Sequence, residues 1–265
     1  MKNLLKEKVK KGEITIGTIV SLGHPDVTEW LSQVGYDWLF LDAEHGAMGL
    51  ETLQQMMQSM KGANCTPVVR PQWNDHALIK RILDIGAHGI IVPMVSSKEE
   101  AKNAVRACKY PPAGIRGFGP RRAAMFDPDY LETANDETLT IVLIETEAAI
   151  RNIDEILSVE GIDVGFMGYD DLSLSMGFGQ PPKWHEPRYL EAFDKVIKAA
   201  NKRGKVAGLH TNLSNSPGNV YWALDRGFRM VTVSDADTFI IQGAQTTLEK
   251  AREAAAKVKP FQGRD

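Results

Sequence analysis

Cysteine is scarce in this sequence, and no hydrophobic run is long enough for a membrane span. Only two cysteines, Cys65 and Cys108, occur in 265 residues, and neither lies in a CxxC motif or a Cys/His cluster, so we expect neither disulfides nor a structural zinc site. No segment supplies the roughly 18 uncharged apolar residues of a spanning helix, and Met1 to Glu13 lack the apolar core of a secretory signal. We therefore predict a soluble, cytoplasmic protein with no membrane partner.

An excess of positive charge is also missing. The sequence contains 31 Lys and Arg residues and 34 Asp and Glu residues, which gives a formal net charge of −3. A protein that wraps nucleic acid or an anionic membrane carries a polybasic surface, so we expect no nucleic-acid partner. A small polar substrate fits this charge balance better.

Eight short apolar runs alternate with longer amphipathic segments. The strand-like runs are Ile16–Val20, Trp38–Leu41, Pro67–Val69, Gly89–Val92, Thr140–Ile144, Val164–Met167, Val206–Leu209 and Met230–Val233. The helical patterns include Leu50–Lys61, Asp75–Ile85, Ser97–Lys109, Ala148–Ser158, Pro187–Arg203 and Ser214–Arg226, each long enough for a crossover onto a parallel sheet. With 43% hydrophobic residues, the chain is predicted to form an α/β fold, a single (β/α)8 TIM barrel in one domain over residues 1–265.

A doubly wound parallel sheet is the alternative architecture. That fold normally has a Gly-rich phosphate-binding turn after its first strand. The segment after Val20 reads Ser21-Leu22-Gly23-His24-Pro25 and contains no such turn, so the sequence favours the barrel.

One insertion interrupts the alternation. Residues 110–128 follow the fourth predicted strand and contain too many prolines and glycines for a helix or an inner strand. Structureless loops longer than about 12 residues in compact domains are often functional. Arg121 and Arg122 could bind an anionic substrate from this loop, or they could be solvated loop charges; the sequence leaves both interpretations open.

Chemically reactive residues gather where the predicted strands end. In chain order they are Asp42, Glu44 and His45, then Arg70, then Glu145, and finally the segment Gly168-Tyr169-Asp170-Asp171-Leu172-Ser173. The C-terminal ends of barrel strands lie at one rim, where such enzymes keep their active sites. We therefore expect these side chains to converge.

Glu145 and Asp171 follow neighbouring predicted strands. Their carboxylates could share one hard divalent cation, with waters and substrate oxygens as the remaining ligands. Because neither His nor Cys accompanies the pair, Mg²⁺ or Mn²⁺ is favoured over Zn²⁺. Two alternatives stay open: the carboxylates could act as general acid and base, or Asp171 could be the N-cap of a short helix.

His45 is the candidate general base. Asp42 lies three residues away, and a neutral imidazole beside a carboxylate works as a base near neutral pH. Asp84, near the end of the helix after the third strand, could also orient the imidazole, or it could be a solvated helix residue. Arg70 could bind an anionic oxygen in a bidentate fork or stabilise enolate charge. No lysine stands at these strand ends, so a metal-stabilised enolate is favoured over a Schiff base.

Six segments, taken together, resemble the HpcH/HpaI family of class II, metal-dependent pyruvate aldolases. They are Tyr36-Asp37-Trp38-Leu39-Phe40-Leu41-Asp42-Ala43-Glu44-His45, Pro67-Val68-Val69-Arg70-Pro71, Val92-Pro93-Met94-Val95, Tyr110-Pro111-Pro112-Ala113-Gly114-Ile115-Arg116-Gly117, Ile144-Glu145-Thr146 and Gly168-Tyr169-Asp170-Asp171-Leu172-Ser173. The resemblance extends from Gly17 to about the final helix, and six motifs in order with matching spacing are highly specific. It implies a TIM barrel of the phosphoenolpyruvate/pyruvate-binding type.

The resemblance also implies a role for each residue at the strand ends. Glu145 and Asp171 would bind the divalent metal, which could be Mg²⁺, Mn²⁺ or Co²⁺. His45 would be the base and Arg70 the oxyanion stabiliser, and Asp84 would raise the basicity of the histidine.

Substrate binding and assembly follow from the same resemblance. Backbone N–H groups of Gly168, Tyr169, Asp170 and Asp171 would hold the substrate carboxylate at a helix start. Family members form hexamers with exchanged C-terminal helices, so we expect a homohexamer in which the helix at about 235–258 is exchanged between subunits.

The implied reaction is reversible cleavage of a 4-hydroxy-2-oxoacid into pyruvate, or a related 2-oxoacid, and an aldehyde. The chain departs from the family pattern at Leu143, where Gln is usual, and at Tyr169 and Asp170, where Pro-Ala is usual; the segments after the seventh and eighth strands also differ. Two other functions stay open. One is an acyl-CoA thioester lyase of the citrate-lyase group, and the other is a non-catalytic 2-oxoacid-binding protein.

Overall fold

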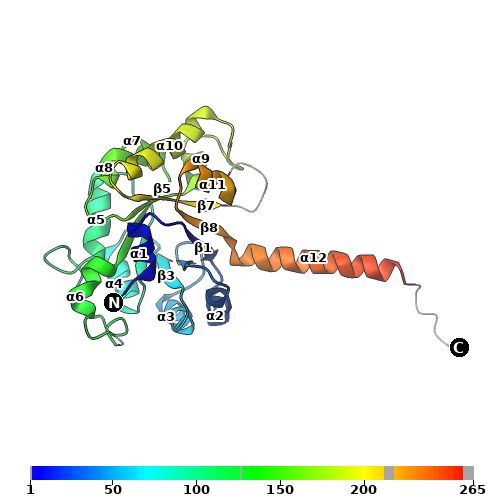
Figure 1. Ribbon diagram of the computed structural model, residues 1–265, viewed down its shortest axis with the longest axis horizontal. Helices are drawn as coiled ribbons and strands as arrows, with labels where there is room; N and C mark the ends of the chain where they lie inside the picture. Colours follow the sequence, from blue (N-terminus) through cyan, green and yellow to red (C-terminus); the bar gives the residue numbers. More distant parts are fainter. Residues whose placement is uncertain (1, 126, 212–217, 259–265) are drawn as a thin grey trace.

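Eight parallel strands close into a barrel in chain order (Figure 1). The computed structural model describes residues 2–125, 127–211 and 218–258. The strands are β1 Thr15–Val20, β2 Trp38–Asp42, β3 Thr66–Arg70, β4 Gly89–Val92, β5 Leu139–Ile144, β6 Val164–Met167, β7 Val206–Thr211 and β8 Met230–Asp235. Because β1 pairs with both β2 and β8, the sheet has no free edge. The predicted (β/α)8 barrel is confirmed, and the doubly wound alternative is wrong.

Helices surround the barrel. They are α1 Leu4–Lys10, α2 Pro25–Gln33, α3 Leu50–Ser59, α4 His76–Asp84, α5 Lys98–Cys108, α6 Tyr130–Glu137, α7 Glu147–Arg151, α8 Ile153–Leu157, α9 Tyr169–Ser175, α10 Pro187–Asn201, α11 Val220–Arg226 and α12 Ala236–Ala256. The helical segment predicted over Ala148–Ser158 is confirmed but divided, since α7 and α8 are separated at Asn152. The amide of Asn152 donates to the Ser96 carbonyl at 2.8 Å, and this tertiary contact outweighs the local helical pattern.

The described part of the 110–128 insertion contains no helix or strand, as predicted. The helix predicted over Ser214–Arg226 is shorter in the structure: α11 begins after Asn219, whose side chain accepts a hydrogen bond from Trp222 N–H at 2.8 Å. Most of the earlier part of that prediction lies outside the described residues. Asn219 is a typical N-cap, and it therefore sets the start of the helix.

The barrel interior is filled by aromatic rings. Trp38, Phe40 and Phe166 contact one another with ring centroids 6.1 to 6.2 Å apart and belong to the cluster formed by the inward residues of the strands. Alternate strand residues such as Leu39 and Leu41 face outward and pack in the larger core beneath the helices. The rings close the interior, so a ligand site is left only at the ends of the barrel.

The C-terminal helix α12 leaves the barrel and extends into solvent (Figure 1). Its first residue, Ala236, is buried, while Ile240, Ile241 and Leu248 are 49 to 58% exposed. Among the described residues, no helix combines the length and apolar character that a membrane span requires. The start of α12 contacts β1 and β8, whereas residues 240–258 are exposed. A long helix that leaves its own barrel in this way is a suitable element for exchange between subunits.

Candidate active site

Side chains alternate between the two faces along each strand. As a result, five positions that are far apart in the sequence lie on the inner face at the C-terminal end of the barrel. These positions are in phase with the inward residues of their strands. Asp42 and Arg70 end β2 and β3, Glu145 and Gly168 directly follow β5 and β6, and His210 precedes the last residue of β7. In a parallel barrel this end carries the active site. The predicted convergence of strand-end residues therefore has a structural basis.

Arg70 is held by two carboxylates. Its Nε and Nη2 donate to the two oxygens of Asp42 at 2.9 and 2.8 Å, and its Nη1 lies 3.1 Å from Glu44 Oε2. Its guanidinium carbon is 5.2 Å from the centre of the Phe40 ring. Burial alone would raise the pKa of Asp42, but the hydrogen bonds and charge of Arg70 hold that pKa below its usual value. The guanidinium is thus fixed in one orientation at the floor of the site.

The predicted contact between Asp42 and the His45 imidazole is wrong. The Asp42 carboxylate accepts the backbone N–H groups of Glu44 and His45 in addition to the Arg70 guanidinium. The His45 side chain is 69% exposed, with Nε2 3.9 Å from Glu44 Oε2. Because arginine forms a bidentate pair with a carboxylate, Asp42 positions Arg70 rather than the histidine.

Glu145 is a buried carboxylate, 4% exposed. Its Oε1 accepts the Met94 N–H at 2.6 Å, and Met94 has a left-handed backbone with a φ of 56°. A Cβ at Gly168 would lie only 2.8 Å from Glu145 Oε2, so only glycine fits there. The pKa of Glu145 is raised to about 7, chiefly by burial and also by the negative charges of Glu44 and Asp171.

Glu44 is a site residue that the sequence prediction did not assign. Its Oε2 is buried and lacks a hydrogen bond of good geometry within the described structure, despite the ion-pair contact with Arg70. Burial raises its pKa, and the negative charges of Asp42 and Asp171 act in the same direction. The strand pattern could not assign it, because β2 ends at Asp42 and Glu44 lies in the turn that follows.

Asp171 lies in the first turn of α9 and is exposed. The N-cap of α9 is Gly168, so the alternative that Asp171 caps a short helix is wrong. Its charge is close enough to influence the pKa values of Glu44 and Glu145. The charges of Glu44, Glu145 and Asp171 therefore act on one another. The Arg70 guanidinium nearby is already paired with Asp42.

The donor set fits a hard divalent cation. In the described part of the chain, no three His, Cys, Asp or Glu side chains form a preassembled ligand cluster. Two carboxylates are nevertheless enough for Mg²⁺ or Mn²⁺, which commonly retain waters and bind substrate oxygens. The buried Oε2 of Glu44 and the raised pKa of Glu145 are the features expected where a cation normally offsets negative charge.

Asp84 and His45 lie at opposite ends of the barrel within one chain, and the prediction that Asp84 acts on this histidine stays a prediction. It is the last residue of α4, at the N-terminal end of the barrel, whereas His45 follows the C-terminal end of β2. Asp84 instead accepts a hydrogen bond at 2.7 Å from Arg116, whose side chain is fully buried and also donates to Tyr130.

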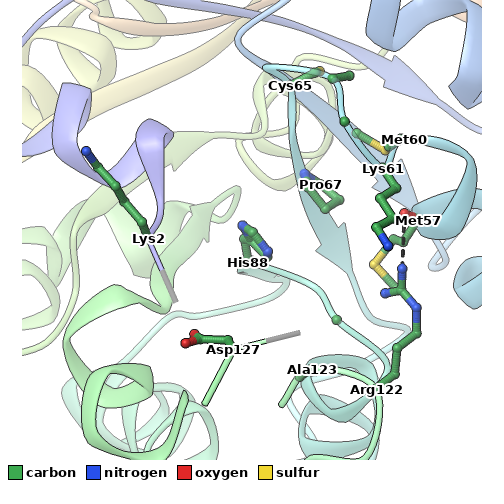
Figure 2. A pocket seen from close by; sticks show the side chains of 13 residues that line it. Lys2, Met57, Met60, Lys61, Cys65, Pro67, His88, Arg122, Ala123 and Asp127 are labelled. Carbon is green, nitrogen blue, oxygen red and sulfur yellow. Dashed lines mark hydrogen bonds between the residues drawn. The ribbon is translucent and has the colours of Figure 1, made fainter. Parts of the chain in front are cut away.

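A cavity of about 490 Å³ opens at the N-terminal end of the barrel and is lined by Lys2, His88, Arg122 and Asp127, among others (Figure 2). Arg122 donates to the carbonyls of Ile85 and Met57, at 2.7 and 3.5 Å. Arg122 is therefore bonded to the protein rather than fully solvated, and substrate binding by Arg121 and Arg122 stays a prediction. None of the strand-end residues lines this cavity, so it is separate from the candidate active site.

His210 is a second residue near the site that the sequence prediction did not assign. It lies on the inner face of β7, and its Nδ1 is 2.8 Å from Thr232 Oγ1 on β8. Its ring stacks on Tyr169, with centroids 5.8 Å apart and an interplanar angle of 5°. Burial lowers its pKa to about 4, so the imidazole is neutral near pH 7.

Comparison with known proteins agrees with this geometry. The family model for HpcH/HpaI aldolase/citrate lyase matches residues 16–236. A 4-hydroxy-2-oxo-heptane-1,7-dioate aldolase of Escherichia coli is 37% identical over 264 residues, covering 98% of this chain and 99% of that protein. The structure of an HpcH/HpaI aldolase from Desulfitobacterium hafniense DCB-2 has a TM-score of 0.85 at 30% identity, covering 99% of this chain and 100% of that one. A family protein from Burkholderia cenocepacia J2315 has a TM-score of 0.88 at 27% identity, covering 95% and 100%. The chain belongs to the HpcH/HpaI aldolase/citrate lyase family and is a carbon–carbon lyase related to the 4-hydroxy-2-oxoheptanedioate aldolases.

Proposed function

We propose that this protein is a metal-dependent aldolase that reversibly cleaves a 4-hydroxy-2-oxoacid into pyruvate, or a related 2-oxoacid, and an aldehyde. The observation that carries the proposal is the concentration of negative charge around Glu145. Its pKa is raised to about 7 by burial and then by Glu44 and Asp171. Such a site favours a divalent cation and, with it, a substrate that bears adjacent carboxylate and keto oxygens.

Glu145 and Asp171 would hold the cation, with Glu44 as a nearby third carboxylate. A bound Mg²⁺, Mn²⁺ or Co²⁺ would polarise the 2-keto group and stabilise negative charge that develops on its oxygen. Glu145 is fixed for this task by the Met94 N–H and by the close approach of Gly168. This fixed position would lower the reorganisation needed when the cation binds.

Arg70 would stabilise the developing enolate oxygen. Cleavage of the C3–C4 bond leaves an electron pair on the pyruvate fragment, and a preoriented guanidinium lowers the free energy of that charge. Asp42 is the positioning residue, because its two hydrogen bonds fix the plane of the guanidinium.

His45 would accept the proton of the C4 hydroxyl, directly or through water. Its exposed imidazole, near Glu44, can receive that proton from a substrate at the barrel mouth. The backbone N–H groups at Gly168, Tyr169, Asp170 and Asp171 would bind the substrate carboxylate at the start of α9. Each of these groups lies at the same end of the barrel.

We further propose a homo-oligomer, a hexamer by family resemblance, in which α12 is exchanged between subunits. The exposed apolar residues of α12 would then be covered by a neighbouring barrel. In such an assembly Asp84 could act only on the His45 of another subunit, since the two lie at opposite ends of one barrel.

Two other functions predict different results in substrate assays. An acyl-CoA thioester lyase would require a pantetheine-bearing substrate, and a non-catalytic 2-oxoacid-binding protein would bind pyruvate without turnover. Leu143, 2% exposed and packed with the inward apolar residues, replaces the polar residue usual in the family and is the feature that motivates the binding-protein alternative.

Pyruvate release from a panel of 4-hydroxy-2-oxoacids tests the proposal. The enzyme is treated with EDTA and assayed before and after addition of Mg²⁺, Mn²⁺ or Co²⁺. We expect release only after metal is restored. Full activity without metal would contradict the metal-dependent mechanism, and inactivity with every metal and substrate would favour the thioester lyase or the binding protein.

A further inference from the structure

His210 and Arg70 belong to one layer of inward side chains at the mouth of the barrel. In a (β/α)8 barrel the register rises by about one residue from strand to strand, so alternate strands contribute the side chains of a layer. The register of adjacent strands places four residues of β1, β3, β5 and β7 in this layer: Ile19, Arg70, Leu143 and His210. Because β3 and β7 are opposite each other in the ring of strands, the guanidinium and the imidazole come from opposite sides of the barrel axis.

Arg70 and His210 supply the polar groups of this layer, since Ile19 and Leu143 are apolar and pack with the inward cluster. The family resemblance places Gln at the position of Leu143. β5 and β7 are the two neighbours of β6 in the sheet. In this chain the polar side chain of the layer that lies beside β6 therefore comes from β7 instead of β5.

Two contacts fix the imidazole of His210. Its Nδ1 lies 2.8 Å from Thr232 Oγ1, and its ring stacks on Tyr169 with the two planes 5° apart. Thr232 is fully buried, and within the described residues His210 is the partner of its hydroxyl. A buried O–H group needs an acceptor, so the hydroxyl donates to Nδ1 and the imidazole proton lies on Nε2. No described residue pairs with Nε2, which is therefore an available N–H donor.

This donor lies beside the proposed position of the substrate carboxylate. Met167 and Leu209 are register partners on β6 and β7, so the residues that follow them, Gly168 and His210, are neighbours. The proposed function places the carboxylate at the backbone N–H groups that begin at Gly168. Because Gly168 has no side chain, none separates the edge of the imidazole from that position at this level of β6.

We propose that His210 is a substrate-binding residue whose Nε2–H donates a hydrogen bond to the carboxylate of the 2-oxoacid, and that Thr232 is its positioning residue. This inference rests on the proposed aldolase function. Arg70 binds the keto oxygen from β3 and His210 binds the carboxylate from β7, so these two groups of the substrate lie between opposite walls of the barrel. A hydrogen bond to a charged acceptor is stronger than one between neutral groups.

Oxamate binding and methyl exchange test the contact without an aldehyde. Oxamate has the carboxylate and the carbonyl group of pyruvate but no methyl group, and calorimetry at saturating Mg²⁺ measures its Kd. Exchange of the pyruvate methyl protons in D2O, followed by NMR with Mg²⁺, gives the KM for pyruvate and the rate of enolate formation. Aldol addition of pyruvate to propanal, at saturating pyruvate, gives the KM for the aldehyde.

His210→Leu removes both ring nitrogens. We expect the Kd for oxamate and the KM for pyruvate to rise by about 10-fold, because the bond is made to a charged acceptor. The KM for propanal should stay within about 2-fold of wild type, since the aldehyde does not contact this nitrogen. His210→Gln restores an N–H group near the position of Nε2 and should keep the Kd for oxamate within about 3-fold of wild type.

Thr232 is tested by a matched pair of variants. Thr232→Val keeps the shape but removes the hydroxyl that fixes the imidazole proton, so the Kd for oxamate should rise by about 3-fold. Thr232→Ser keeps the hydroxyl and should retain the wild-type Kd. His88→Leu, at the other end of the barrel, is the control and should leave all three constants unchanged. The increase in melting temperature produced by Mg²⁺ should persist in every variant, which shows that the metal site is intact.

The outcomes separate this assignment from the aldolase function. Wild-type exchange with an unchanged Kd for oxamate in His210→Leu would overturn the contact alone, as would a raised KM for propanal with an unchanged Kd. If His210→Leu does not fold, an equal Kd in Thr232→Val and Thr232→Ser would overturn it. Oxamate binding without exchange would contradict the aldolase function, and the Kd of His210→Leu would still decide the contact. Absence of both with every metal would overturn the function and the contact together. Weaker binding in His210→Leu that is restored in His210→Gln would support the proposal.

Discussion

Asp42 and Arg70 are directly opposite each other on adjacent strands, and their side chains form two parallel hydrogen bonds of 2.9 and 2.8 Å. The strand register of β2 and β3 creates this pair, because register partners on the same face of a sheet point the same way. Asp42 therefore fixes the plane of the guanidinium at the C-terminal end of the barrel, and Glu44 lies 3.1 Å from its Nη1.

Asp42→Asn should reduce both stability and turnover. The amide can accept only one of the two hydrogen bonds, so a largely buried guanidinium keeps Glu44 as its remaining counter-charge, and loss of one buried partner typically costs about 3 kcal/mol. We expect a lower melting temperature and a fall in kcat/KM of at least about 10-fold, with little change in metal affinity. Thermal unfolding and pyruvate release measure the two effects. Glu51→Gln on the exposed surface of α3 is the control, and a turnover equal to wild type in Asp42→Asn would show that Arg70 needs no fixed partner.

Much of the fold followed from the sequence, but the partners of individual charges did not. Short apolar runs separated by amphipathic segments identify the strands and helices, since burial depends on local periodicity. The pairing of Asp42 with Arg70 depends on register, and the stacking of His210 on Tyr169 depends on how two distant strand ends are brought together. Asp84 was placed correctly, at the end of the helix after β3. A helix that starts at the C-terminal rim ends at the opposite rim, so within one chain its last residue lies away from the site.

Glu145→Gln should remove metal binding without destabilising the metal-free protein. The amide oxygen can still accept the Met94 N–H, while removal of a buried charge relieves desolvation and the repulsion from Glu44 and Asp171. We expect the metal-free melting temperature to equal or exceed that of wild type. The increase that Mg²⁺ or Mn²⁺ produces in wild type should disappear, along with metal-dependent pyruvate release. A metal-induced increase retained in this variant would exclude Glu145 as a ligand.

His45→Ala should impair chemistry but not folding. The imidazole is 69% exposed, so its removal leaves no buried cavity and the melting temperature should stay within about 1 °C of wild type. Cleavage should fall by roughly 10²-fold or more, because general-base catalysis contributes on this scale. Pyruvate and metal binding, measured by calorimetry, should be largely intact. Turnover at the wild-type rate would remove His45 from the mechanism, and His24→Ala on the equally exposed start of α2 serves as the matched control.

Replacing Ile240 and Ile241 by Asp should dissociate the proposed oligomer. Both side chains are more than half exposed in the single chain, so charges there are tolerated by the isolated barrel but not by an apolar contact with a neighbouring subunit. Light scattering should show a smaller particle, while circular dichroism shows an unchanged barrel. Glu249→Ala, on the same helix, should retain the assembly. An assembly of unchanged mass in the double Asp variant would argue against α12 as the exchanged element.

The stability of the protein should fall as the pH is lowered from about 6.5 toward 4, in part through His88. Burial, followed by nearby positive charges that include Arg122, lowers the pKa of this histidine to about 4, whereas an unfolded histidine has a pKa of about 6.5. Within that window the unfolded chain binds the proton and the folded chain does not, so the free energy of unfolding decreases as pH falls, by at most about 1.4 kcal/mol per pH unit for one histidine. Above pH 6.5 both states are neutral and the contribution is constant. Urea unfolding at several pH values should therefore give a shallower dependence for His88→Asn than for wild type. Equal slopes for the two proteins would mean that His88 is protonated in the folded state as readily as in the unfolded chain.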